Sequence, residues 1–489
     1  MQPLTTDEPE ASTTAQRVRS EHDLLGDRDV PAEAYYGIHT ARAVDNFPIS
    51  GVPIAMHRDL VVAMACCKQA AALANRELGM LTLDKTAAIV AACADIRAGM
   101  LHEQFVVDVV QGGAGTSTNM NANEVIANRA LEHLGQPKGH YERLHPLDDV
   151  NRSQSTNDVY PTAIKIALHM STGRLLTAMA ELRAAFEAKA DEFANVVKMG
   201  RTQLQDAVPM TLGQEFGAFA VMMGEDIDRL TEATKLITEI NLGGTAIGTG
   251  VNTHPRYAEV VRRHLTSITG ITLTTAPDLI EANQDAGVFV QLSGVLKRIA
   301  VKLSKICNDL RLLSSGPQAG FGEIRLPAVQ AGSSIMPGKV NPVIPEVVNQ
   351  IAFAVVGHDM TVTMAAEGGQ LQLNAFEPII AHSLFTSVSY LRAGCQVLAD
   401  RCVPGIEAER DHLRHTVERS IGVLTALSPY IGYAQTSSLV HEAFTTGKGA
   451  HELVLDHGLL TRDELDALLG DPIQLTRPHR PFAEIDLPD

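Results

Sequence analysis

The chain has 489 residues, of which 45% are hydrophobic and 4% aromatic, and it carries 40 Lys and Arg against 57 Asp and Glu. The formal net charge of −17, without any run rich in Lys or Arg, argues against nucleic acid and anionic membranes as partners. No stretch of about 18 apolar residues lacks a charge or a Gly/Pro break, so no membrane-spanning helix is predicted. Because the first residues are acidic and polar, unlike a secretory signal, we expect a cytoplasmic protein.

Six cysteines form no C-x-x-C pair and sit mostly among Ala, Val and Leu, which predicts buried thiols rather than disulfides or metal ligands. These cysteines are Cys66, Cys67, Cys93, Cys307, Cys395 and Cys402. His140 and His145 lie close in sequence but belong to no zinc-type ligand set. The sequence therefore predicts no metal site.

Residues 1–18 are rich in Thr, Ser, Pro and acid with almost no aliphatic content, which predicts a disordered leader. Residues 19–155 contain aliphatic segments at helical spacing, such as LVVAMACCKQAAALANREL and TAAIVAACADIRAGML, separated by short polar or Gly breaks. This pattern predicts a helical N-terminal domain.

Residues 156–405 have apolar residues that recur on one face over unusually long segments. The clearest stripes run over 161–196 and 284–313, and further long helices are predicted near 211–239, 343–365 and 378–401. Several long helices with apolar faces predict a mostly α protein with a central bundle, and surplus apolar surface predicts an oligomer. Residues 406–489 have shorter helical segments and more Gly, which predicts a small C-terminal helical domain.

Two polar stretches precede predicted helices. In GGAGTSTNMNANEVIAN (112–128), a Gly-rich segment leads into a run of Thr, Ser and Asn that is longer than helix capping requires, which favours an anion-binding loop. In HPLDDVNRSQSTNDVYPTA (145–163), Ser and Thr precede a long helix for which Pro161 is a candidate first residue. Capping explains only one residue of each run.

A third stretch, 314–350, is long and rich in Gly and Pro, and its embedded apolar residues favour a functional loop over disorder. Its GSSIMPGKV string has five residues between the glycines and Val340 where a phosphate-binding P-loop needs Ser or Thr. The glycines of 241–250 follow no buried strand, so a dinucleotide fold is not supported either. With no metal set and no nucleotide-binding loop, we expect chemistry on a small anionic substrate that uses hydroxyls, amides and one lysine.

Four strings occur together and in order: GTSTNMNANEVIAN, SQSTNDVYPTA, KMGRTQLQDAVPMTLGQEF and GSSIMPGKVNP. They resemble the aspartase/fumarase superfamily of lyases, most closely its aspartase branch, and the resemblance runs from about Arg19 to about Gly470. It implies a mostly α, three-domain fold in which the central long helices form the core of a homotetramer. It also implies active sites built from three subunits, and reversible trans elimination of ammonia from L-aspartate to fumarate without a cofactor.

By position in the motif, the resemblance implies that Ser333 is the general base that removes the proton beside the β-carboxylate and leaves a doubly charged aci-carboxylate. Loop N–H groups, the helix start near Val343 and the cation of Lys339 would lower the pKa of this serine. Hydroxyl donors would hold oxygens whose charge grows during the reaction. The residues that match this role are Thr116, Ser155, Thr156 and Ser334.

The α-carboxylate would be held by a cation and neutral donors, matched by Thr202, Lys339 and Asn341, with Asn157 near the amino group. Gln203 stands in GRTQ where fumarases and some aspartases have GRTH. A glutamine can hydrogen-bond but cannot shuttle a proton, and this favours the ammonia-lyase activity. Fumarate hydratase, with the same base and water as leaving group, and an inactive homologue resembling the lens crystallins remain the alternatives.

Overall fold

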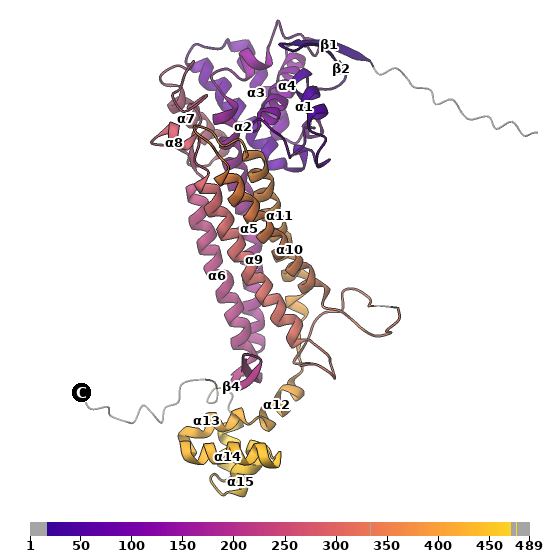
Figure 1. The fold of residues 1–489 in the computed structure, drawn as a ribbon, viewed down its shortest axis with the longest axis vertical. Coiled ribbons are helices and arrows are strands. Elements are labelled where there is room, and N and C mark those ends of the chain that lie inside the picture. Colours follow the sequence, from indigo (N-terminus) through magenta and orange to yellow (C-terminus); the bar gives the residue numbers. More distant parts are fainter. Residues whose placement is uncertain (1–16, 333, 471–475, 477–489) are drawn as a thin grey trace, which may run out of the picture. The chain divides into compact units, whose positions relative to one another are not determined.

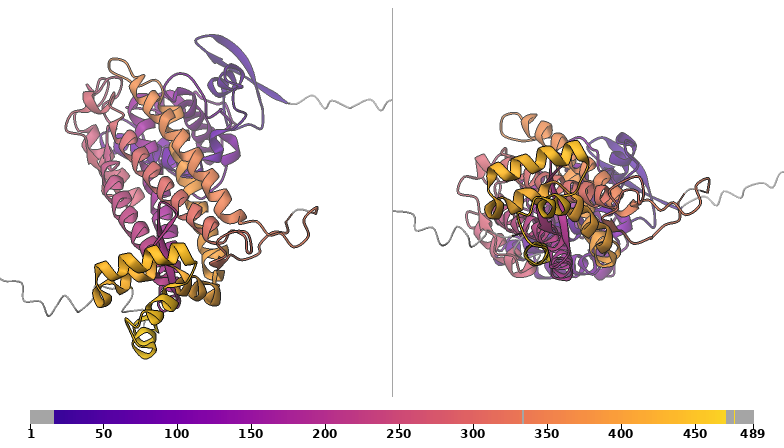
Figure 2. Two further views of the ribbon diagram at one scale, coloured as in Figure 1. Left: turned by 60° about the horizontal axis from the view of Figure 1, so that its bottom comes forward. Right: turned by 90° about the horizontal axis from the view of Figure 1, so that it is seen from below.

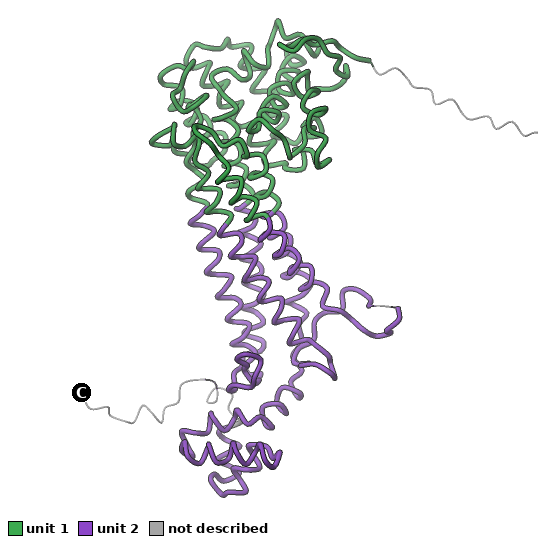
Figure 3. Tube along the Cα trace, viewed as in Figure 1, with its two compact units in different colours: residues 1–171, 234–293, 358–386 green, residues 172–233, 294–357, 387–489 purple. Residues whose placement is uncertain are grey.

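The computed structural model describes residues 17–332, 334–470 and 476. The predicted leader lies outside the described residues except for its last two positions. The chain divides into two compact units, shown in Figure 3. Unit 1 comprises Met1–Ser171, Thr234–Ser293 and His358–Thr386, and unit 2 comprises Thr172–Ala233, Gly294–Gly357 and Ser387–Asp489.

Five long helices run through both units, as the sequence pattern predicts, and they lie alongside one another in Figures 1 and 2. They are α5 (Thr156–Glu192), α6 (Leu212–Leu236), α9 (Gly287–Leu313), α10 (Val343–Glu367) and α11 (Glu377–Arg401). α5 alone has 37 residues, a length of about 55 Å at the usual helical rise. The mostly α fold with a long-helix bundle is therefore confirmed.

Unit 1 adds helices that pack around α2, with α3 and α7 against it and α4 against α3. Its helices are α1 (Ile38–Asn46), α2 (Arg58–Glu77), α3 (Leu83–Arg97), α4 (Thr116–His133), α7 (Tyr257–Thr269) and α8 (Leu279–Ala282). Short turns are η1 (Ile54–Met56), η2 (His102–Gln104) and the π-type turn η3 (Pro146–Val150). An antiparallel hairpin, β1 (Val18–Asp23) and β2 (Gly26–Pro31), precedes them, and β5 (Glu239–Ile240) pairs in parallel with β6 (Thr274–Thr275).

Unit 2 adds an antiparallel hairpin, β3 (Val197–Thr202) and β4 (Gln205–Thr211), and a short pair, β7 (Ile324–Arg325) and β8 (Glu407–Ala408). After the turn η4 (Val403–Gly405) come α12 (Arg410–Arg419), α13 (Gly422–Ile431), α14 (Tyr433–Thr446), α15 (Ala450–Asp456) and α16 (Arg462–Gly470). These C-terminal helices share one apolar core with Met199 of β3. The small C-terminal helices therefore support the β3–β4 hairpin.

Within unit 2, aromatic and ionic contacts join the long helices. Phe186 of α5 packs against Phe216 and Phe219 of α6 with ring centroids 6.3 and 5.6 Å apart. The fully buried carboxylate of Asp226, also on α6, lies 3.0 Å from Arg298 Nε on α9. Lys302 of α9 lies 3.2 Å from the same carboxylate, so apolar faces and one buried carboxylate with two cationic partners align these helices.

The start of α5 corrects the sequence prediction, because Pro161 lies inside the helix and not at its beginning. A proline has no N–H, so the carbonyl oxygen of Asn157 loses its usual helical donor. The Nδ2 atom of Asn241 donates to that oxygen instead, at 3.0 Å. A side chain distant in sequence therefore lets the helix continue back to Thr156.

All six cysteines are free and buried, as predicted. Burial raises the pKa of the Cys395 and Cys402 thiols to about 12, so they are unreactive side chains of the core. No helix among the described residues combines the length and apolar character needed to cross a membrane.

A partly buried histidine pair lies in unit 1. His57 Nε2 and His382 Nδ1 lie 2.9 Å apart, and the ring of Phe385 packs on His57. Burial and the neighbouring His382 lower the pKa of His57 to about 4. An unfolded histidine titrates near about 6.5, so below that pH the unfolded state takes up the proton first.

We therefore expect the stability of the wild type to fall as the pH drops from about 6.5 to about 4, with His57 contributing on the order of 2–3 kcal/mol. His57→Gln should reduce this loss, and should change nothing that depends on pH above about 7. Thermal unfolding midpoints at several pH values measure the effect, with His415→Gln, an exposed histidine, as the control. Parallel pH curves for wild type and His57→Gln would contradict the assignment.

Candidate active site

The first candidate element is the loop before α4. Gly115 has φ +89°, and a Cβ there would lie 2.2 Å from the Tyr160 ring, so only glycine fits. Thr116 begins the helix, its hydroxyl donates to the carbonyl of Gly113 at 2.6 Å, and its side chain is exposed. The Gly-rich segment thus brings the backbone close to α5 and presents Thr116 to solvent.

Thr116 lines a cavity of about 490 Å³ together with His39 and Arg42 of α1. The buried carboxylate of Glu124 holds His39 Nδ1 at 3.0 Å and raises the pKa of this histidine. Arg42 is paired with Asp23 at 2.8 Å. The cavity wall therefore combines a hydroxyl with two basic side chains of unit 1.

The start of α5 forms a reciprocal cap. The Asn157 N–H donates to the Ser155 hydroxyl at 3.2 Å, while the Ser155 N–H donates to Asp158 Oδ1 at 2.9 Å. Asp158 is fully buried, and its Oδ2 accepts from the N–H groups of Gly243 and Thr245, each at 2.9 Å. Burial raises the pKa of Asp158 to about 6, although the three N–H donors favour its ionised form.

This arrangement fixes the Ser-Thr-Asn run of the sequence against one loop. Asn157 Nδ2 donates to the carbonyl of Ala246 at 2.8 Å, so its amide is already engaged. Thr156, the first residue of α5, is 8% exposed, and its hydroxyl oxygen accepts from Asn119 Nδ2 at 3.0 Å. The cap accounts for Ser155, whereas the Thr156 hydroxyl keeps its proton for another acceptor.

In unit 2, Thr202 ends β3 and Gln203 begins the tight turn into β4. Gln203 and Leu204 have φ of 54° and 62°, the left-handed pair of a two-residue type I′ hairpin turn. Residues other than Gly or Asn pay on the order of 1 kcal/mol each for this conformation. Thr202 and Gln203 are exposed at the tip, so strained backbone presents both side chains.

A buried carboxylate ties this hairpin to the long loop. Glu323, 1% exposed, pairs with Lys198 Nζ at 2.8 Å and contacts the Arg201 guanidinium, both on β3. Arg201 also stacks on the Phe321 ring, 4.3 Å from its centroid. The strand that carries Thr202 is therefore held to the segment that leads into the loop at 326–342.

That loop lines a cavity of about 550 Å³ with the exposed Lys339, the partly buried Asn341, and Arg311 from α9. A Cβ on Gly332 would lie 1.7 Å from the Lys339 carbonyl oxygen, so the loop closes on itself where only glycine fits. Ser334 is exposed within it. Ser333, the predicted base, lies outside the described residues.

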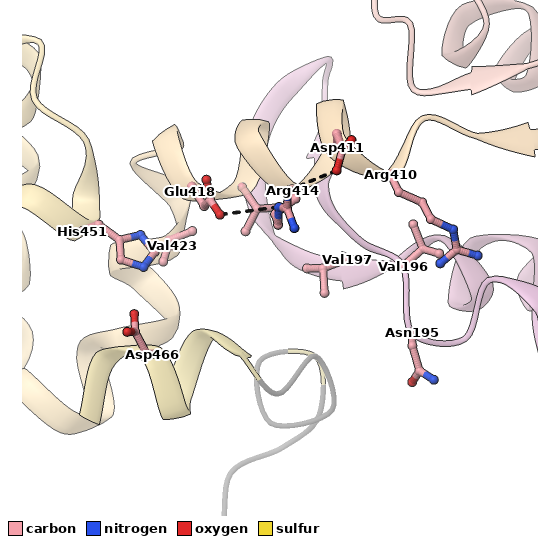
Figure 4. A pocket seen from close by; sticks show the side chains of 11 residues that line it. Asn195, Val196, Val197, Arg410, Asp411, Arg414, Glu418, Val423, His451 and Asp466 are labelled. Atoms are coloured by element: carbon pink, nitrogen blue, oxygen red, sulfur yellow. Dashed lines mark hydrogen bonds and ion pairs between the residues drawn. The ribbon is translucent and has the colours of Figure 1, made fainter. Parts of the chain in front are cut away.

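A second cavity of unit 2, about 460 Å³, contains none of the predicted residues (Figure 4). Arg414 lies between Asp411 and Glu418, at 3.1 and 3.8 Å, and Arg410, His451 and Asp466 complete a wall of mixed charge. Carboxylates line both cavities of this unit, here Asp411, Glu418 and Asp466 and in the other Glu346 and Glu409, but only the other cavity contains predicted site residues. The cavity with Lys339 is the better candidate in this unit.

The described site residues thus fall into two groups. Unit 1 carries Thr116, Ser155, Thr156 and Asn157, and unit 2 carries Thr202, Gln203, Ser334, Lys339 and Asn341. Their roles in substrate binding stay predictions. Among the described residues, no three His, Cys, Asp or Glu side chains cluster in a way that could hold a metal ion.

Sequence analysis included Asn119 in the polar run before α4 but did not predict its contact with Thr156, and it missed the lysine that contacts Asn119, Lys68. The sequence does contain a signal that could have indicated Lys68. Lys68 falls on the apolar stripe of α2, three or four residues from Met64 and Ala71, where a charged residue is unusual.

Comparison with known protein families identifies the class of protein to which this chain belongs. The model of a lyase family matches residues 26–357, and the model of the fumarase C C-terminus matches residues 423–477. The chain therefore belongs to the aspartase/fumarase lyase family.

Three relatives within this family show how similar the chain is to particular enzymes and structures. The chain is 59% identical to an aspartate ammonia-lyase of Pseudomonas fluorescens over 94% of this chain and 96% of that protein. A cobalt-bound structure described as a fumarate lyase:delta crystallin from Brucella melitensis is 57% identical with a TM-score of 0.92, covering 94% of this chain and all of that one. A class II fumarase from Schistosoma mansoni is 35% identical with a TM-score of 0.89, over 95% of this chain and all of that one.

The Glu323 anchor gives a testable prediction. Glu323→Gln leaves Lys198 buried with only one carboxylate, Glu215, at 2.5 Å, and removing one member of a buried ion pair typically costs about 3–5 kcal/mol. We expect a clear fall in the thermal unfolding midpoint. Glu409→Gln is the control, because it removes an exposed partner of Arg325 in the cavity that contains Lys339. It should lower the free energy of unfolding by less than about 1 kcal/mol. Equal thermal unfolding midpoints for the two variants would contradict the claim that Glu323 anchors the hairpin.

Proposed function

We propose that this chain catalyses the reversible elimination of ammonia from L-aspartate to give fumarate, as a carbon–nitrogen lyase. The observation that carries the proposal is the 59% identity to an aspartate ammonia-lyase over nearly the whole chain, against 35% to a class II fumarase. Gln203 at the hairpin tip supports it, because an amide can bind an amino group but cannot relay a proton to water.

In the proposed reaction, Ser333 Oγ removes a proton from the carbon beside the β-carboxylate, and the electron pair moves into that carboxylate. The pair then returns to form the carbon–carbon double bond as the C–N bond breaks and ammonia leaves. Hydroxyl donors stabilise the intermediate charge, and their preorganisation supplies much of the catalysis. The exposed Thr116 and the free proton of Thr156 support this role for the unit 1 group, which also contains Ser155. Ser334, from the unit 2 group, has the same proposed role.

The α-carboxylate keeps its charge throughout, so a fixed cation suits it. Lys339 forms no ion pair with any described carboxylate, and it shares a cavity wall with Asn341. Thr202 joins them through the hairpin that Glu323 anchors. The remaining polar contact, from Asn157 toward the amino group, would require its amide to exchange its bond to Ala246.

We propose further that the enzyme is a cytoplasmic homotetramer in which the unit 1 and unit 2 groups of different chains, drawn from three subunits, complete each site. The division of the predicted residues between two units supports this arrangement. An exposed apolar stripe on α10 offers a surface for another chain, with Phe353 66% and Met364 68% exposed. In the same proposal, 19–155, 156–405 and 406–489 are the three domains.

Substrate choice is tested by offering L-aspartate and L-malate separately to the purified protein and following fumarate by ultraviolet absorbance. We expect fumarate from aspartate, and little or none from malate. Turnover of malate alone would replace the proposal by a fumarate hydratase, and turnover of neither would favour an inactive structural homologue.

The base is tested by Ser333→Ala, which should leave assembly intact and lower turnover by several orders of magnitude, because the proton acceptor is lost. Ser334→Ala is the matched control. It removes a neighbouring hydroxyl that is assigned to stabilise the charge of the intermediate, so its turnover should also fall, but less than after loss of the base. Near-normal turnover of Ser333→Ala would sink the assignment.

A further inference from the structure

Lys68 is a buried cation without a carboxylate partner. It lies on α2, is 0% exposed, and forms no ion pair with any described residue. Its Nζ donates to Asn119 Oδ1 at 2.6 Å and to Asn151 Oδ1 at 2.8 Å. Burial lowers the pKa of this lysine to about 7, which measures how unfavourable the position is for a charge. A core position alone would be filled at lower cost by Leu or Met.

The lysine fixes the orientation of Asn119, which is itself 0% exposed. An ammonium has only donors, so when Lys68 is charged the oxygen of the amide faces it and the nitrogen faces away, as in the structure. Asn119 Nδ2 then donates to Thr156 Oγ1 at 3.0 Å and to Asn151 Oδ1 at 3.2 Å. A flipped amide would set donors against donors at the lysine.

The orientation of Asn119 determines how the Thr156 hydroxyl can form hydrogen bonds. A hydroxyl that accepts from Asn119 retains its own proton as a donor, and a chain of aligned hydrogen bonds polarises that donor. We propose that Lys68 is a positioning residue, which through Asn119 sets the Thr156 hydroxyl as a donor toward the carboxylate oxygens that gain charge during the elimination. The inference rests on the proposed function, and it adds to the site Asn119, which has no role assigned by the motifs, and Lys68, which lies outside them.

The decisive variant is Asn119→Asp. The aspartate has nearly the same shape and still accepts from Lys68, but it can donate neither to Thr156 nor to Asn151. The Thr156 hydroxyl therefore turns to donate to the new carboxylate. Loss of one preorganised donor typically lowers kcat about 100- to 1,000-fold. We expect a fall in kcat of that size for L-aspartate, with KM changed less than about threefold and the thermal midpoint not lowered.

Asn151→Asp is the matched control. It makes the same substitution at the other amide that Lys68 contacts, and it leaves the Asn119–Thr156 hydrogen bond in place. Its kcat should stay within about threefold of wild type. Lys68→Met, which keeps the apolar stem and removes the cation, should lower kcat about tenfold or more without a matching rise in KM.

Wild-type turnover of L-aspartate is measured first. If the wild type does not turn over L-aspartate, both the proposed function and the positioning role of Lys68 are overturned. If the wild type is active, a normal kcat for Asn119→Asp would overturn only the positioning of Thr156 by Lys68 and Asn119. Equal losses of kcat in Asn119→Asp and Asn151→Asp, or a loss of kcat that follows the fall in thermal midpoint, would overturn it as well. Those results would make Lys68 a structural residue of unit 1.

Discussion

Burial of the apolar faces of five long helices is the constraint on which the rest of the structure depends. Helices of this length bring their polar groups together only at their ends, in the connecting loops. Thr116 begins α4, Thr156 begins α5, Thr202 follows α5, and Lys339 precedes α10. The predicted site residues therefore lie in loops or at the first residues of helices, and each of these segments needs its own anchor.

Those anchors are buried polar groups rather than additional apolar contacts. Asp158 binds three backbone N–H groups at the start of α5, and Glu323 binds Lys198 and Arg201 beside the hairpin. Each carboxylate is expensive to bury and is compensated only in one geometry. This requirement explains how strained or Gly-dependent segments, such as the Gln203 turn, keep one conformation.

The sequence predicted the long helices well, because each stripe of apolar residues repeats with a helical period over several turns. The start of α5 was wrong, because the Asn241 side chain that replaces the missing N–H of Pro161 comes from another part of the chain. The motifs also gave the candidate site residues, which stay predictions, but not the residues that support them. Lys68 stood out as a charge in an apolar stripe, yet only the fold shows that it contacts Asn119.

A continuous helix of 37 residues stands in the sequence between Thr156 and the segment that carries Thr202, and the two groups of site residues belong to different units. Completion of each site by different chains is tested most directly by mixing two inactive variants, Thr156→Ala and Ser333→Ala, after mild dissociation and reassembly. Random mixed tetramers should recover up to about a quarter of wild-type activity, because some sites then receive both intact groups. Reassembled mixtures that stay as inactive as the separate variants would contradict shared sites.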